Sequence, residues 1–175
     1  TNEYSLAPNY AKMFKTDGEL NQESILEIQA AKDAGDGDTY WSRYGQCQGV
    51  RGSGDWDLGW GWNTPTASLV SSYEAGDLRK DGTILFSGQF DGGPETGGYG
   101  ATVDPLTNEL YWNKKVYNTK ASYVEAGLGT PNNEAQNTWV NYRALRYADV
   151  LLLAAEAANE IGGATNTDNA ETWVN

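Results

Sequence analysis

Residues 142–163 restrict the fold of this chain more than any other stretch, because their pattern predicts one long helix. Six alanines together with several leucines make the stretch apolar over most of its circumference, which is typical of a helix packed between other helices. Gly162 and Gly163 follow the last turn, where glycine accepts the left-handed backbone that ends a helix. A membrane span is excluded, since the apolar run over 150–155 is far shorter than the roughly 20 residues that a bilayer requires. The stretch therefore indicates a mainly α-helical fold.

Charge and composition exclude several classes of function. The chain has 175 residues, which suits one domain, and a formal net charge of −12. A nucleic-acid partner is disfavoured, because attraction to phosphates needs clustered cations and the 12 Lys and Arg are scattered. With no histidine and the single Cys47, the sequence offers no imidazole-based catalytic site, no zinc site and no internal disulfide. We therefore expect no metal and no cofactor.

Two segments, 34–63 and 88–100, are rich in glycine, and the first interleaves glycine with tryptophan and tyrosine. Loops of this length are uncommon in compact domains unless they are functional or disordered. Large aromatic side chains argue against disorder, because they bury extensive surface when they pack. We therefore expect the segment 34–63 to be ordered and to carry function.

The other predicted elements are short. We expect a short helix over 8–15, a strand over 23–29, a helix that Thr64 caps and Gly76 ends, strands within 83–90 and 110–116, a mostly irregular stretch over 118–140, and a helix start at Asp168. A helix that starts at Asp168 has little body before Asn175 and is marginal by itself. We therefore expect the natural chain to continue past this point.

Three blocks, 10–29, 59–79 and 145–160, resemble successive blocks of the SusD/RagB family, in that family's order. The second block contains Gly-Trp-Gly-Trp-Asn-Thr-Pro-Thr, and the third contains Leu-Arg-Tyr-Ala-Asp-Val-Leu-Leu-Leu-Ala-Ala-Glu. The resemblance implies a SusD-like helical scaffold of the tetratricopeptide-superhelix type, with loop-rich insertions and a few short strands. Members of the family are longer, so we expect residues 1–175 to be a single SusD/RagB-like region that is truncated at both ends.

The resemblance also implies a function. Such proteins are nutrient-binding lipoproteins on the extracellular face of a Gram-negative outer membrane, where they bind oligosaccharides without cleaving them. They deliver the ligand to a TonB-dependent transporter of the SusC type and are held to the membrane only by a lipid anchor, which is absent from these residues. Three alternatives stay open: a glycoside hydrolase, a binder of peptides or other nutrients, and a protein that only docks on the transporter.

Sugar chemistry directs the choice of candidate site residues. Sugar rings pack their C–H faces on Trp and Tyr, and their hydroxyls bind acids, amides and Arg. The predicted glycan contacts are therefore aromatic and polar residues of the two loops: Trp41, Arg43, Tyr44, Asp55, Trp56 and Tyr99. Each of them has a purely structural role as its alternative. Trp60 and Trp62, within the second family block, are expected to be buried scaffold that holds the loop in place.

The acidic residues allow two further hypotheses, and the spacing supports neither. The segment 33–38 is dense in carboxylates, but they do not follow the spacing of an EF-hand calcium loop. Asp55 and Glu95 form a nominal glycosidase pair, yet nothing in the sequence selects this pair among 24 acidic residues. Two charged pairs are expected to be local structural contacts: Arg146 with Asp149, and Asp77 with Arg79.

Overall fold

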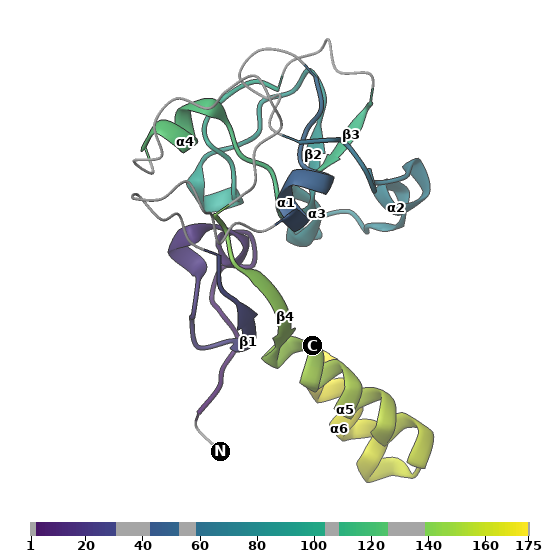
Figure 1. Cartoon of the computed structure of the whole chain (residues 1–175). Helices are drawn as coiled ribbons and strands as arrows, with labels where there is room; N and C mark the ends of the chain where they lie inside the picture. The colour runs from purple at the N-terminus through teal and green to yellow at the C-terminus, as the bar shows by residue number, and fades with distance from the viewer. Residues whose placement is uncertain (1–2, 31–42, 53–58, 104–108, 126–138, 175) are drawn as a thin grey trace. The chain divides into compact units, whose positions relative to one another are not determined.

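The computed structural model describes residues 3–30, 43–52, 59–103, 109–125 and 139–174. It divides into two compact units, each built from separate stretches of the chain. The first unit contains residues 1–8, 20–28 and 143–175, and the second contains residues 9–19 and 29–142. Helices predominate and the strands are few and short, as the sequence predicts (Figure 1). No described helix has both the length and the apolar character needed to cross a membrane.

The first unit ends in two helices, α5 (Tyr147–Ile161) and α6 (Ala164–Val174), which pack side by side (Figure 1). Their contact is made of small side chains, which let two helix backbones approach closely: Ala155, Ala158 and Ala170. Gly162 and Gly163 have φ angles of 72° and 86° and end α5 as predicted. The last helix begins at Ala164, earlier than the predicted start at Asp168.

The predicted helix over 142–163 is wrong in its first five residues. The stretch forms strand β4 (Tyr142–Arg146), which pairs with β1 (Ser24–Ile28), itself within the predicted strand. One cause is the attraction between the strands, because Arg143 Nε lies 3.6 Å from Oε1 of Glu27 and both side chains are at most 5% exposed. The helix begins only where the carboxylate of Asp149 accepts the backbone N–H of Arg146, at 2.9 Å.

Further charged contacts lie where β4 ends and α5 begins. The Arg146 guanidinium reaches Asp149 at 3.1 Å and Glu23 at 3.4 Å, so the predicted pairing of Arg146 with Asp149 is confirmed. The other carboxylate oxygen of Glu23 accepts the backbone N–H of Ala7 at 2.8 Å. Glu23 is only 2% exposed, and this set of partners offsets the cost of burying its charge.

The sequence predicts that α5 is enclosed on most sides, but several of its large apolar side chains are exposed. Within the described residues α5 packs one face on α6, and Leu152, Leu153 and Ile161 are 55%, 61% and 76% exposed. Ala155 and Ala158 form the packed face of α5, and these three larger side chains lie outside it. The expectation of a helix buried on most sides is therefore wrong for this part of the chain.

The second unit is built from short elements: η1 (Lys12–Phe14), η2 (Thr16–Gly18), α1 (Arg43–Gln48), α2 (Ala67–Ser72), α3 (Leu78–Thr83), β2 (Ile84–Phe86), η4 (Pro94–Thr96), β3 (Tyr111–Asn113) and α4 (Lys120–Glu125). The strands β2 and β3 lie within predicted strands and pair antiparallel, with Leu85 opposite Trp112. Thr66 rather than Thr64 caps α2, accepting the backbone N–H of Leu69 at 3.2 Å. The helices α1 and α4 occupy stretches that were predicted to be irregular.

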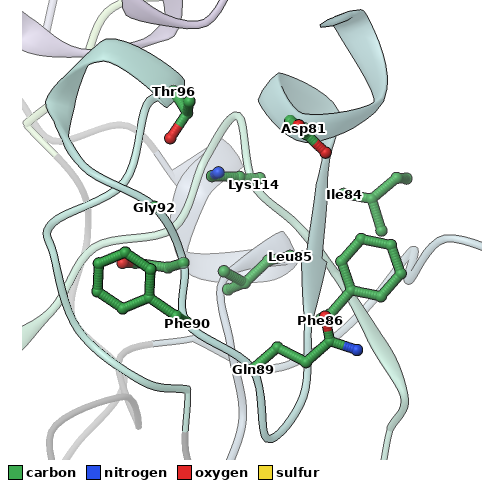
Figure 2. A pocket seen from close by; sticks show the side chains of 10 residues that line it. Asp81, Ile84, Leu85, Phe86, Gln89, Phe90, Gly92, Thr96 and Lys114 are labelled. Carbon is green, nitrogen blue, oxygen red and sulfur yellow. The ribbon is translucent and has the colours of Figure 1, made fainter. Parts of the chain in front are cut away.

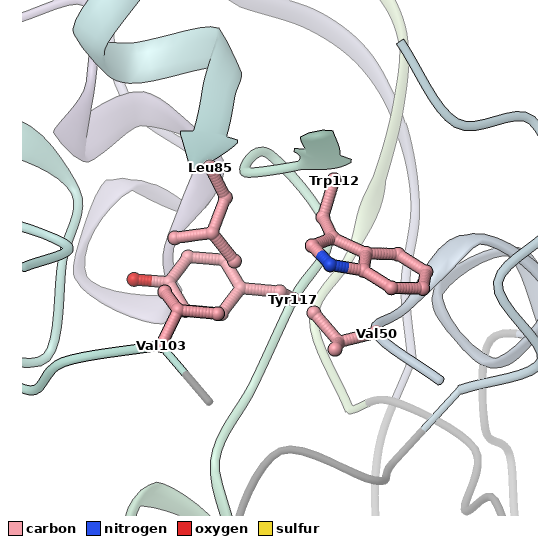
Figure 3. Packing of buried hydrophobic residues seen from close by; sticks show 5 residues of the cluster. All are labelled: Val50, Leu85, Val103, Trp112 and Tyr117. Atoms are coloured by element: carbon pink, nitrogen blue, oxygen red, sulfur yellow. The ribbon is translucent and has the colours of Figure 1, made fainter. Parts of the chain in front are cut away.

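The core of the second unit lies around the two paired strands. Five side chains, each at most 2% exposed, pack together there (Figure 3): Val50, Leu85, Val103, Trp112 and Tyr117. Trp112 comes from β3 and Leu85 from β2, whereas the other three come from the segments around these strands. The core therefore fixes both glycine-rich segments, since Val50 follows α1 and the partly buried Tyr99 packs against the cluster.

Candidate functional site

The first glycine-rich segment folds around the short helix α1. The backbone N–H of Trp60 donates to the carbonyl of Gln46 at 2.8 Å, and that of Trp62 donates to the carbonyl of Cys47 at 2.9 Å. Main-chain hydrogen bonds therefore hold residues 59–62 against the carboxyl half of α1. This arrangement places two tryptophans beside a helix that carries two of the predicted glycan contacts.

Gly61 lets this segment lie directly on the core. Its φ of +69° favours glycine, and a Cβ at this position would lie 2.9 Å from Cζ3 of the Trp112 indole. The backbone therefore packs on the buried Trp112 ring, between Trp60 and Trp62. A substituent larger than hydrogen at Gly61 would push the two tryptophans off their support.

Trp60 and Trp62 form an aromatic pair at the surface. Their ring centroids are 4.9 Å apart with an interplanar angle of 52°, and Trp62 is 58% exposed. The prediction that Trp62 is buried scaffold is therefore wrong, because its backbone holds the loop while its indole faces solvent. Trp60 is half-buried and fits the predicted scaffold role better.

The amide of Gln48 fixes the end of α1. Its Oε1 accepts hydrogen bonds from Nδ2 of Asn63 at 3.0 Å and from Nδ2 of Asn113 at 2.8 Å. Asn113 is the last residue of β3, so the helix is tied to the same strand that carries Trp112. The position of α1 thus depends on the core and not on the loop alone.

Two of the predicted contacts, Arg43 and Tyr44, lie at the start of α1 and are exposed. The Tyr44 ring packs on the ring of Tyr142 with centroids 4.6 Å apart, and the two residues are 41% and 37% exposed. Nη1 of Arg43 donates to Oε1 of Gln46 at 3.1 Å, which leaves the guanidinium further donors. We call the five residues on and beside this helix the α1 aromatic group: Arg43, Tyr44, Trp60, Trp62 and Tyr142.

Tyr99 is partly buried and is held by contacts within the second unit. Its hydroxyl donates to Oδ1 of Asn118 at 2.8 Å, and its ring meets the edge of Tyr117 at 5.3 Å. Burial raises the pKa of Tyr99 to about 12. The role of Tyr99 as a glycan contact stays a prediction. The other predicted contacts, Trp41, Asp55 and Trp56, lie outside the described residues and stay predictions as well.

Asp91 holds the second glycine-rich segment on the core. This carboxylate is 3% exposed and accepts three hydrogen bonds, from the hydroxyl of Tyr117 at 2.7 Å and from the backbone N–H groups of Tyr99 and Ala101 at 2.8 Å each. Burial and the charge of Asp91 both raise the pKa of Tyr117, because they disfavour a phenolate. The phenol therefore stays a donor to the carboxylate.

The acidic residues of the described part do not gather into a metal site. No three His, Cys, Asp or Glu residues in that part lie close enough together to hold a metal ion, and the acidic segment 33–38 is outside it. Glu95 is exposed and forms an ion pair with Lys12. The pairing of Asp77 with Arg79 is confirmed at 2.6 Å, and the hydrogen bonds from Arg79 lower the pKa of the Asp77 carboxyl.

Sequence reasoning missed Trp62 and Tyr142 as exposed aromatic residues. The pattern Trp-Gly-Trp does not reveal which of its residues contacts the core, and in the structure that residue is Gly61. The sequence predicts Tyr142 to be the first residue of a helix. Its place beside Tyr44 depends on a contact between residues far apart in the chain, which no local pattern reveals.

These features define a class of protein: a helix-rich chain that presents tryptophan and tyrosine side chains from glycine-rich loops. The sequence model of the SusD family matches residues 22–175, and the chain therefore belongs to this family. The resemblance of the three sequence blocks is thereby confirmed.

Individual relatives share the fold over most of this chain. SusD-like protein P2 from Formosa agariphila is 29% identical over 142 residues, covering 77% of this chain and 26% of that protein. Surface glycan-binding protein A from Bacteroides uniformis has a TM-score of 0.66 at 23% identity, over 99% of this chain and 33% of that one. A laminarin binding SusD-like protein has a TM-score of 0.66 at 24% identity, over 98% of this chain and 38% of that one. The chain thus spans between about a quarter and two fifths of the length of these relatives.

Proposed function

We propose that the protein binds an oligosaccharide on the α1 aromatic group and does not cleave it. The observation that carries this proposal is the exposed Trp62 indole, whose backbone is fixed to α1 and whose neighbour Gly61 lies on the core. An indole held in this way offers a flat apolar face to sugar C–H groups at little cost in side-chain entropy. Arg43 supplies guanidinium donors for hydroxyls beside Tyr44.

Family membership supports the wider role. We propose that the protein acts on the extracellular face of the outer membrane as a lipoprotein and delivers its ligand to a SusC-type TonB-dependent transporter. Two structural neighbours are named as glycan-binding or laminarin-binding proteins, which favours a glycan over a peptide ligand. The α1 aromatic group offers rings and a guanidinium rather than two facing carboxylates, which favours binding over glycoside hydrolysis. Trp41, Asp55 and Trp56 belong to the same loop, and we propose them as additional contacts.

The test combines a glycan array, which includes laminarin fragments, with calorimetric titration of the best ligand. Trp62→Ala and Tyr44→Ala are each expected to weaken binding about tenfold, because each removes a ring of the size that contributes about 1.4 kcal/mol when buried. Both side chains are well exposed, so the melting temperature should change little. Leu78→Ala is the matched control, since Leu78 is 81% exposed and lies outside the group.

Binding that survives both ring substitutions would refute the site. Reducing ends released from the ligand by the purified protein would refute the non-catalytic role and favour the glycoside hydrolase. If no glycan binds but the protein co-purifies with the transporter, the docking role replaces the binding role.

A further inference from the structure

A separate pocket lies in the second unit, beside the paired strands β2 and β3. It has a volume of about 230 Å³ and is lined by residues of α3, β2, the second glycine-rich segment and the residue that follows β3. Figure 2 shows the side chains around this space: Asp81, Phe86, Gln89, Phe90, Thr96 and Lys114. None of them belongs to the α1 aromatic group. The pocket thus needs its own explanation.

Lys114 is the unusual residue of this pocket. The residue as a whole is 4% exposed, and its side chain lines the pocket, so the pocket is where a ligand can meet its ammonium. Burial lowers the pKa of this ammonium, against the opposing influence of Asp91 and Asp81. An ammonium that lines a pocket can donate to three acceptors. Oxygen atoms of a ligand in the pocket would accept from it.

The other lining groups define which oxygen atoms fit. Asp81 and Asp91 both line the pocket with Lys114, so two carboxylates face one ammonium and an anionic ligand is disfavoured. Hydroxyl groups accept from an ammonium and also donate to a carboxylate, and the Gln89 amide can do both. A neutral polyhydroxyl compound therefore matches the polar groups.

The apolar groups and the volume narrow the choice to a sugar ring. Phe90 is 64% exposed at the pocket, and Phe86 lines it with its ring edge-to-face to Tyr111. A phenyl face packs on the C–H face of a sugar as other aromatic rings do. The volume lies below the roughly 300–1,000 Å³ of pockets that bury drug-sized ligands, so it suits one ring rather than several.

We propose that this pocket is a second carbohydrate site, which takes one neutral sugar ring through hydroxyl contacts to Lys114, Asp81 and Gln89 and a stacking contact to Phe90. The site goes beyond the oligosaccharide surface on α1 and does not require it. A pocket for a single ring selects a chain end, a branch or a free monosaccharide, whereas an open aromatic surface accepts the interior of a chain.

The experiment titrates the protein with D-glucose, D-galactose, D-mannose and D-glucuronate, followed by NMR chemical shifts. At least one neutral hexose is expected to bind with millimolar affinity, and glucuronate is expected to bind more weakly than glucose. Phe90→Ala should weaken hexose binding about fivefold, since it removes an apolar contact. Lys114→Met should weaken it about tenfold or more, since it removes a charged donor.

Three controls make the outcome decisive. Leu110→Ala, which removes a 71% exposed side chain outside the pocket, should leave hexose binding unchanged. Trp62→Ala should also leave hexose binding unchanged while weakening oligosaccharide binding, so failure of one site is distinguishable from failure of the other. Phe90→Ala changes an exposed side chain and serves as the test if Lys114→Met does not fold. Absence of binding by all three neutral hexoses, tighter binding of glucuronate, or hexose binding unaffected by Phe90→Ala would overturn the proposal.

Discussion

Removing the hydrogen bond from Tyr117 to Asp91 tests how the core holds the second glycine-rich segment. The phenol oxygen lies 2.7 Å from Oδ2 of a carboxylate that is 3% exposed, and Tyr117 itself is 1% exposed. Tyr117→Phe removes this one hydroxyl and keeps the ring, which packs on Leu85 and Val103. The substitution therefore isolates the hydrogen bond from the packing.

The expected magnitude follows from the remaining partners of the carboxylate. A hydrogen bond to a charged group contributes about 1.5–3 kcal/mol, and loss of one partner leaves buried Asp91 with two backbone N–H donors. We expect Tyr117→Phe to lower the free energy of unfolding by about 2 kcal/mol, near the middle of that range. Urea titration followed by tryptophan fluorescence measures this change, because Trp112 lies in the same cluster.

Tyr111→Phe provides the matched control. The hydroxyl of Tyr111 has no hydrogen-bond partner among the described residues, and the ring stays against Phe86. Its removal should change the free energy of unfolding by less than about 0.5 kcal/mol. Equal effects of the two substitutions would show that the Asp91 carboxylate does not depend on the phenol, and the argument would be refuted.

Two further predictions concern the same unit. Burial raises the pKa of Tyr99 to about 12, above its ordinary value near 10, so the fold favours the neutral phenol. The contribution of Tyr99 to stability is constant below pH 10 and is lost between about pH 10 and 12, by up to about 3 kcal/mol. Urea titrations should therefore show stability falling across pH 10–12, and a flat profile in that range would contradict this. Gly61→Ala should lower the free energy of unfolding by about 2–3 kcal/mol in the same assay and weaken oligosaccharide binding, because it combines a positive φ with a clash on Trp112. Gly76 has a positive φ of 88° but open space around it, so Gly76→Ala should lower the free energy of unfolding by only about 1 kcal/mol. Equal losses would contradict the proposed support of the loop.

Sequence patterns predict the helix ends and strands that depend on interactions between residues close together in the chain. The end of α5 at Gly162 and the strand over 24–28 follow from glycine chemistry and from alternation, and both are confirmed. The strand over 142–146 was missed because its partners, Glu23 and Glu27, lie more than one hundred residues earlier. Helix propensity in this stretch is high, so only the tertiary pairing explains why it is extended.

The candidate site was predicted in part, for a similar reason. Residue chemistry placed Arg43 and Tyr44 in a binding loop, but it did not predict the helix of six residues that carries them. A helix this short is not stable alone, and here Gln48 and the backbone of 59–62 hold it in place. The prediction of a buried Trp62 rests on its place in the second family block, whereas the core contact of this segment is made by Gly61, which carries no hydrophobic signal.

The strand β3 and the residue after it connect both proposed sites. Trp112 lies under Gly61, Asn113 binds the amide that fixes α1, and Lys114 lines the sugar-ring pocket. Of these three consecutive residues, two support the segment and the helix beside the exposed Trp62 indole, and the third lines the pocket. A shift of this strand would alter both sites together, whereas Trp62 and Phe90 lie on loops and are exposed. A substitution on one of the loops should therefore weaken binding at one site, whereas a substitution in β3 should weaken binding at both.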